Sequence, residues 1–89
     1  PTIIKDPNAV LDYTLDLTSW LTNLSDSIVS VTTEAVGVTV ESTDIVQGNK
    51  IIAWVSGGVV GEEAYVTFRF TTSANRIDDR TIAFDIKQR

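Results

Sequence analysis

The chain of 89 residues contains neither cysteine nor histidine. Without cysteine, no disulfide can support the fold, and without either residue the usual zinc sites are excluded. Histidine is also the side chain best suited to proton transfer near neutral pH. We therefore expect a protein that is not an enzyme and that needs no metal and no cofactor.

Lysine is the remaining candidate for an unusual general base, and there are only three lysines, Lys5, Lys50 and Lys87. Each lies in a polar or terminal stretch, where we expect no lowering of its pKa. A serine nucleophile would therefore lack an activating partner. This pattern again argues against catalysis.

Long apolar runs and clustered positive charge are missing as well. No window approaches the roughly 18 consecutive apolar residues of a membrane-spanning helix, and the first residues lack the basic-then-apolar order of a signal peptide. The chain has 12 acidic and 7 basic side chains, a net charge of -5, whereas phosphate binding needs clustered lysine and arginine. We expect a soluble protein with no membrane and no nucleic-acid partner.

What the sequence does contain is a repeated alternation of apolar and polar residues, with turn residues every 8 to 12 positions or so. The length suits one domain. These patterns predict an all-β, immunoglobulin-like β-sandwich of about seven antiparallel strands. The expected strands cover residues 11–17, 28–33, 38–41, 45–46, 50–56, 64–70 and 80–87.

The clearest alternation lies in residues 64–70 and 80–87, which should form a hairpin with Ala74 and Asn75 at its tip. The side chains expected inward are Val66, Phe68, Phe70, Ile82, Phe84 and Ile86. After the first strand the period changes from two to that of a helix. A short helical turn is therefore predicted near residues 18–24, formed around Leu17, Trp20, Leu21 and Leu24.

Residues 1–10 show no period and are predicted to form an extended N-terminal arm outside the sandwich domain of residues 11–89. Such an arm either lies on a neighbouring protein or is a disordered tail. If it docks, the candidate interface residues are Ile3, Ile4, Lys5, Asp6, Pro7 and Tyr13.

Two aromatic residues, Trp54 and Tyr65, fall on the polar phase of their strands. Exposed aromatics are typical of interface hot spots, so a patch containing both is a candidate docking surface. A one-residue bulge would instead turn either side chain into the core.

The densest charge cluster is Asp78, Asp79 and Arg80. Carboxylates of this kind could bind calcium, but neighbouring strand residues point to opposite faces. Surface pairing with Arg76 or Arg80 is the preferred interpretation, and the cluster is kept as a candidate interface.

Four short blocks resemble a known family: KDPNAVLDY (5–13), DLTSWL (16–21), WVSGG (54–58) and TTSANRIDDR (71–80). In this order they resemble the small bacteriophage proteins called fiber-tail adaptors. The resemblance implies a virion structural protein, made in the host cytoplasm, that joins tail fibers to the tail tube or nozzle. It also implies several copies in a symmetric assembly.

Two other functions stay open at this point. A capsid decoration protein would share the fold and differ in its partner. A carbohydrate-binding module would use Trp54 and Tyr65 as a sugar platform on one face of the sandwich.

Overall fold

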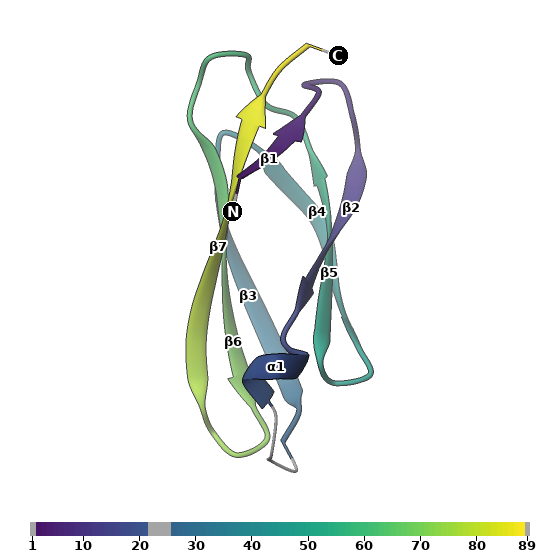
Figure 1. The fold of residues 1–89 in the computed structure, drawn as a ribbon, viewed down its shortest axis with the longest axis vertical. Coiled ribbons are helices and arrows are strands. Elements are labelled where there is room, and N and C mark those ends of the chain that lie inside the picture. The colour runs from purple at the N-terminus through teal and green to yellow at the C-terminus, as the bar shows by residue number, and fades with distance from the viewer. Residues whose placement is uncertain (1, 22–25, 89) are drawn as a thin grey trace.

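The computed structural model describes residues 2–21 and 26–88, which form two packed β-sheets (Figure 1). The elements in chain order are β1 (Thr2–Lys5), β2 (Leu11–Asp16), α1 (Thr18–Leu21), β3 (Ile28–Val36), β4 (Thr39–Val46), β5 (Lys50–Ser56), β6 (Ala64–Thr72) and β7 (Ile77–Ile86). The predicted all-β sandwich of seven strands is therefore confirmed.

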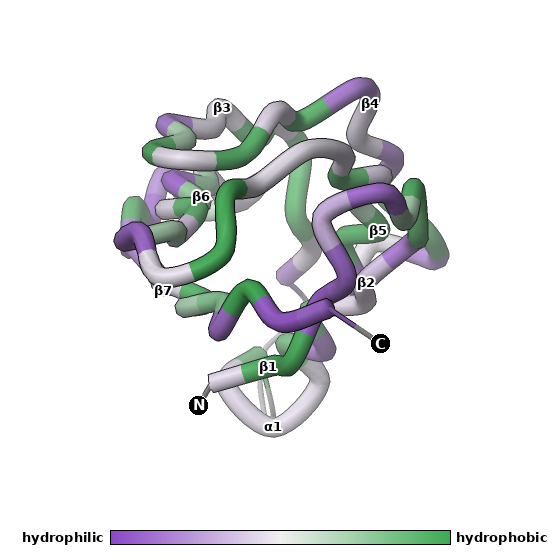
Figure 2. The backbone as a smooth tube through the Cα atoms, turned by 90° about the horizontal axis from the view of Figure 1, so that it is seen from above, coloured by the Kyte–Doolittle hydropathy of each residue, from purple (hydrophilic) through white to green (hydrophobic). Residues whose placement is uncertain are grey.

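The sheets have the strand orders β1-β7-β6-β3 and β2-β5-β4. Seen from above in Figure 2, β3, β6 and β7 lie on one side and β4, β5 and β2 on the other. Apart from the first strand, this is the immunoglobulin arrangement, in which the middle strands of each sheet pair with antiparallel neighbours. The first strand differs, because β1 pairs with β7 in parallel.

The core lies between the two inner faces, where apolar side chains of alternate residues meet. All six side chains expected inward in the long hairpin are buried, and so are those of Ile51, Ala53 and Val55 on the facing sheet. At the hairpin tip Asn75 has a φ of 65°, the left-handed conformation that the sequence predicted there. This hairpin is the part of the fold that periodicity describes best.

The two short strands expected around residues 38–41 and 45–46 are one strand, β4. The register of β4 against β5 shifts between Val40 and Ser42, which marks a bulge. A bulge adds one residue and breaks the alternation, so a continuous strand looks like two. The count of seven strands holds because β1, which was not predicted as a strand, replaces the one lost.

The expected arm outside the sandwich is wrong for Thr2–Lys5, because these residues form β1. Thr2 pairs with Ala83 and Lys5 with Ile86 at the edge of the larger sheet. Residues 2–4 are all β-branched, and β-branched residues fit a pleated surface. The strand is too short for its alternation to be recognised.

The predicted helical turn is present as α1, where the Thr18 amide donates to Asp16 Oδ1 at 2.9 Å and so caps the turn. Its predicted continuation to residue 24 lies outside the described residues. The Trp20 ring meets Phe70 edge-on with centroids 5.2 Å apart, and the Arg76 guanidinium lies 4.1 Å from the same ring. The turn therefore closes one end of the core.

The molecule is elongated, measuring 43 × 19 × 18 Å. We call the upper end in Figure 1 the loop end; it consists of residues 6–10, 37–38, 57–63 and 87–88 and the strand ends beside them. The opposite end, which we call the hairpin end, consists of α1 and residues 26–27, 47–49 and 73–76.

Candidate interaction surfaces

The two aromatic residues predicted to share a patch lie on different sheets. Trp54 projects from the outer face of β5 with 41% of its surface exposed, while half-buried Tyr65 lies on the outer face of β6. Both outward phases were predicted correctly, but the outer faces of a sandwich point in opposite directions. The single patch, and a sugar platform made of both rings, are therefore ruled out by the topology.

Trp54 lies on an acidic sheet face. The strand register places it between Asp12 on β2 and Ser42 on β4, and the next row holds Ile52 beside Asp44. Trp54 is thus an exposed ring with the Asp12 carboxylate beside it and the Asp44 carboxylate in the next row of the face. Its neighbours give this face a negative charge that a cationic partner would meet favourably.

Tyr13, predicted as an interface residue, is partly buried and packs against the core. Its ring meets Phe84 edge-on with centroids 5.1 Å apart and an interplanar angle of 71°. Its hydroxyl is buried and has no hydrogen-bond partner among the described residues. Burial raises the pKa of this hydroxyl, as does the nearby Asp12 carboxylate. Most of this side chain therefore packs within the sandwich, and only part of it is exposed.

Lys5 is buried, with only 1% of its surface exposed. Its ammonium group donates three hydrogen bonds to backbone carbonyls, to Asp6 at 3.0 Å, Ala9 at 2.7 Å and Gly57 at 2.6 Å. Burial lowers the pKa of Lys5, contrary to the expectation from sequence, while Asp6 acts in the opposite direction. The chain turns back after β1, so that backbone carbonyls surround the ammonium group. Neither the periodicity nor the composition of the sequence reveals this burial.

The remaining residues of the expected arm divide between the core and the surface. Ile3 packs against the core, whereas Ile4 points outward and is 48% exposed. Asp6 accepts a hydrogen bond from the Asn8 amide at 2.8 Å and so shapes the turn into β2, with Pro7 half-buried in that turn. Of this group, Ile4 is the apolar side chain available for contact.

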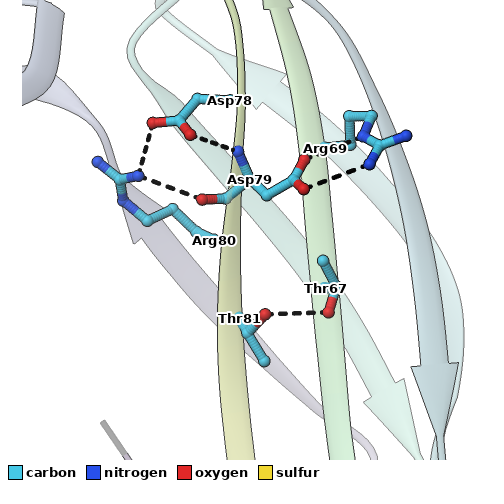
Figure 3. A network of polar contacts seen from close by, with 6 residues as sticks. All are labelled: Thr67, Arg69, Asp78, Asp79, Arg80 and Thr81. Atoms are coloured by element: carbon cyan, nitrogen blue, oxygen red, sulfur yellow. Dashed lines mark hydrogen bonds and ion pairs between the residues drawn. The ribbon is translucent and has the colours of Figure 1, made fainter.

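The charge cluster on β7 is paired within the chain (Figure 3). Asp79 binds Arg69 of β6 through two hydrogen bonds of 3.0 and 3.3 Å, and Asp78 binds Arg80 at 2.8 Å. The predicted pairing with Arg80 is confirmed. In the described part of the chain no group of three or more acidic, histidine or cysteine residues could hold a metal ion, and no helix there is long and apolar enough to cross a membrane.

A group of exposed apolar side chains in the β5–β6 connection was not predicted. It lies at the loop end, where the connection between β5 and β6 exposes Val59 and Val60 by 57% and 54%. A hollow of about 310 Å³ adjoins it, lined by Val36, Gly37, Val59, Glu62 and Glu63. Two consecutive valines between glycines cannot both point inward in a short loop. This pattern was the signal in the sequence that could have indicated an exposed apolar side chain here.

Residues 5–85 match the model of a protein family described as podophage GP4 fiber-tail adaptor protein gp77. The chain belongs to this family. The match spans every element except most of β1 and the end of β7, and it includes all four sequence blocks that carried the resemblance. No curated protein matches the chain.

Membership makes this adaptor a phage virion component that interacts with other tail or fiber proteins. The family is structural and does not correspond to a class of enzymes. For such a protein the relevant sites are contact surfaces. Within the described residues, the loop end and the Trp54 face both expose apolar side chains beside carboxylates that form no ion pair there.

Proposed function

We propose that this adaptor is a structural joint that attaches tail fibers to the tail tube or nozzle by protein-protein docking and without catalysis. The observation that carries the proposal is the match of residues 5–85 to the fiber-tail adaptor family. We further propose that it is made in the host cytoplasm and enters the virion in several copies arranged with the symmetry of the tail.

The geometry supports a joint. The molecule is a narrow rod 43 Å long whose two ends are built from different loops. A rod with different ends can contact different proteins at each. Because each adaptor presents little surface for contact, several copies would together bind a fiber more strongly than one copy could.

A phage with an interrupted adaptor gene tests this proposal. We expect particles that lack fibers but keep filled heads, and restoration of fibers when the chain is supplied from a plasmid. Protein quantification should find the chain on purified tails and not on isolated heads. Its presence on heads alone would instead identify a capsid decoration protein, and fully fibered particles without the chain would overturn the proposal.

A further inference from the structure

We propose that the loop end is the docking surface of the adaptor and that its occupant is a protein surface with an apolar recess edged by lysine or arginine. This inference rests on the proposed function and deepens it by assigning the surface and the chemistry of the partner.

The first support is the distribution of exposed apolar side chains. Among residues 2–21 and 26–88, nine large hydrophobic side chains are exposed, and six of them are at the loop end. These six are Ile4, Val10, Leu11, Val36, Val59 and Val60. They come from β1 and the connection into β2, from the end of β3 and from the loop before β6, so the fold brings together three separate stretches of the chain.

The loop that carries the two valines is supported by hydrogen bonds and by packing against the neighbouring turn. Its tip is a turn in which the Glu62 amide donates to the Val59 carbonyl at 3.0 Å, with Gly61 at a φ of 83°. One end of the loop is fixed by the Lys5 ammonium on the Gly57 carbonyl at 2.6 Å. A surface that is already ordered loses less conformational entropy when it binds.

The other end of the same loop packs against the turn between β3 and β4. A Cβ atom placed on Gly37 would lie 2.1 Å from the Glu63 carbonyl oxygen, so the two segments are in close contact. Lys5 and Gly37 thus fix the loop from both sides of the sandwich. The valines are presented by a supported turn.

Charge identifies the partner. Glu62 and Glu63 at the loop end, and Asp12 and Glu41 on the sheet face beside it, have no ion-pair partner among the described residues. The cations described at this end are Lys5, which is buried, and Lys87, whose Nζ lies 3.4 Å from an Asp85 carboxylate oxygen. Toward the hairpin end, by contrast, three arginines each pair with an aspartate. The unneutralised carboxylates disfavour anionic lipid, nucleic acid or a second copy of the same end, and favour a cationic rim on a protein.

The size of the end indicates the shape of the partner. A cross-section of 19 × 18 Å is well below the roughly 800 Å² that each side of a standard stable interface buries. A stable contact must therefore also cover the sheet face beside the loop end, where Trp54 is exposed. A recess that receives the end meets this requirement, whereas a flat surface does not.

The test uses particles from a phage with an interrupted adaptor gene, mixed with purified full-length chain. The loop-end variant is Val59→Ser with Val60→Ser, and the matched control is Val29→Ser with Ile77→Ser, which are 56% and 65% exposed away from the loop end. We expect the loop-end variant to lower the amount of chain or of fiber on the particles at least tenfold. The control should leave both amounts at the wild-type level.

A second variant tests the charge. Glu62→Lys with Glu63→Lys should reduce attachment in the same assay, and wild-type attachment should weaken as salt rises. Attachment of both loop-end variants at the wild-type level would overturn this inference but not the proposed function. An equal loss of attachment in the control variant would do the same. So would a dimer of the purified chain that dissociates in the variant Val59→Ser with Val60→Ser. Failure of the wild-type chain to attach at all would overturn the proposed function as well.

Discussion

Lys5 is a buried residue that connects two loops of the loop end. It is the donor for three carbonyl groups, of Asp6, Ala9 and Gly57, that belong to two separate loops. A buried carbonyl left without a donor is costly.

We therefore predict that Lys5→Met, which keeps the aliphatic stem but removes the donor, lowers the free energy of unfolding by roughly 2–4 kcal/mol. Urea denaturation measures this change. Lys87→Met is the control, since its surface pair with Asp85 is worth about 0.5 kcal/mol or less. Similar losses in the two variants would show that the three carbonyls do not need Lys5.

Asp26 makes the equivalent connection at the hairpin end, where it accepts hydrogen bonds from Ser73 Oγ at 2.7 Å and the Ala74 amide at 3.0 Å. Burial alone would raise its pKa, but hydrogen bonds from Ser73, Thr72, Ala74 and Ser27 lower the pKa to about 2. A carboxyl with a lowered folded pKa stabilises the protein above its unfolded pKa of 3.8, and that contribution is lost as the pH falls toward about 2.

Thermal unfolding measured from pH 7 to pH 2 should therefore show a fall in the midpoint between about pH 4 and pH 2. Asp26→Asn should flatten this part of the curve, and Ser73→Ala, which removes one of the hydrogen bonds, should flatten it partly. An unchanged fall in Asp26→Asn would assign the acid sensitivity to other carboxylates.

Residue-level prediction from sequence worked where a side chain follows the phase of its strand. Trp54 and Phe68 were assigned to the correct sides because their strands alternate without interruption. Lys5 was not, because its burial depends on two loops that fold over it. Contacts between distant segments leave no periodic signal.

At the scale of elements, the long hairpin was predictable and the edge strands were not. β6 and β7 have nine and ten residues, enough for several periods of alternation. β1 has four residues, and β4 contains a bulge at which the alternation fails. Short or bulged edge strands owe their conformation to their neighbours, so the sequence alone describes them poorly.

The contact between the β3–β4 turn and the β5–β6 loop gives a matched pair of glycine substitutions. Gly37 and Gly61 both have positive φ, 74° and 83°, but only Gly37 has a neighbour within 4 Å of an added Cβ atom. Ala at either site costs about 1 kcal/mol of backbone strain. We predict that Gly37→Ala costs at least about 2 kcal/mol more than Gly61→Ala, because the Glu63 backbone must move. Equal losses in denaturant titrations would contradict the close contact.

Because β1 belongs to the sheet, its removal should affect folding and not only docking. Deletion of residues 1–5 exposes the edge of β7 and removes Ile3 and Lys5 from their packed positions. We predict a marked loss of thermal stability and a tendency to aggregate through the open edge. Ile4→Ser, which alters only an outward side chain, should unfold at nearly the wild-type temperature. A truncated chain as stable as the wild type would restore the view of this segment as a detachable arm.

For the whole molecule, the main feature is the difference between its two ends. The hairpin end balances its charges internally, whereas the loop end combines exposed valines with free carboxylates. The sequence predicted a docking protein of the correct family but not the location of this surface. Its members lie up to 56 positions apart in the chain, from Ile4 to Val60, and come together only through the order of the strands.

The parallel pairing of β1 with β7 also limits when the loop end can form during synthesis of the chain. Thr2 and Ala83 are neighbours in the sheet, so their contact closes a loop that includes nearly the whole chain and cannot form until β7 has left the ribosome. Lys5 and the end of β7 both belong to the loop end, so we predict that this end is completed only after the rest of the chain has been synthesised. On the proposal that the loop end docks, we expect nascent chains that lack β7 to be unable to attach.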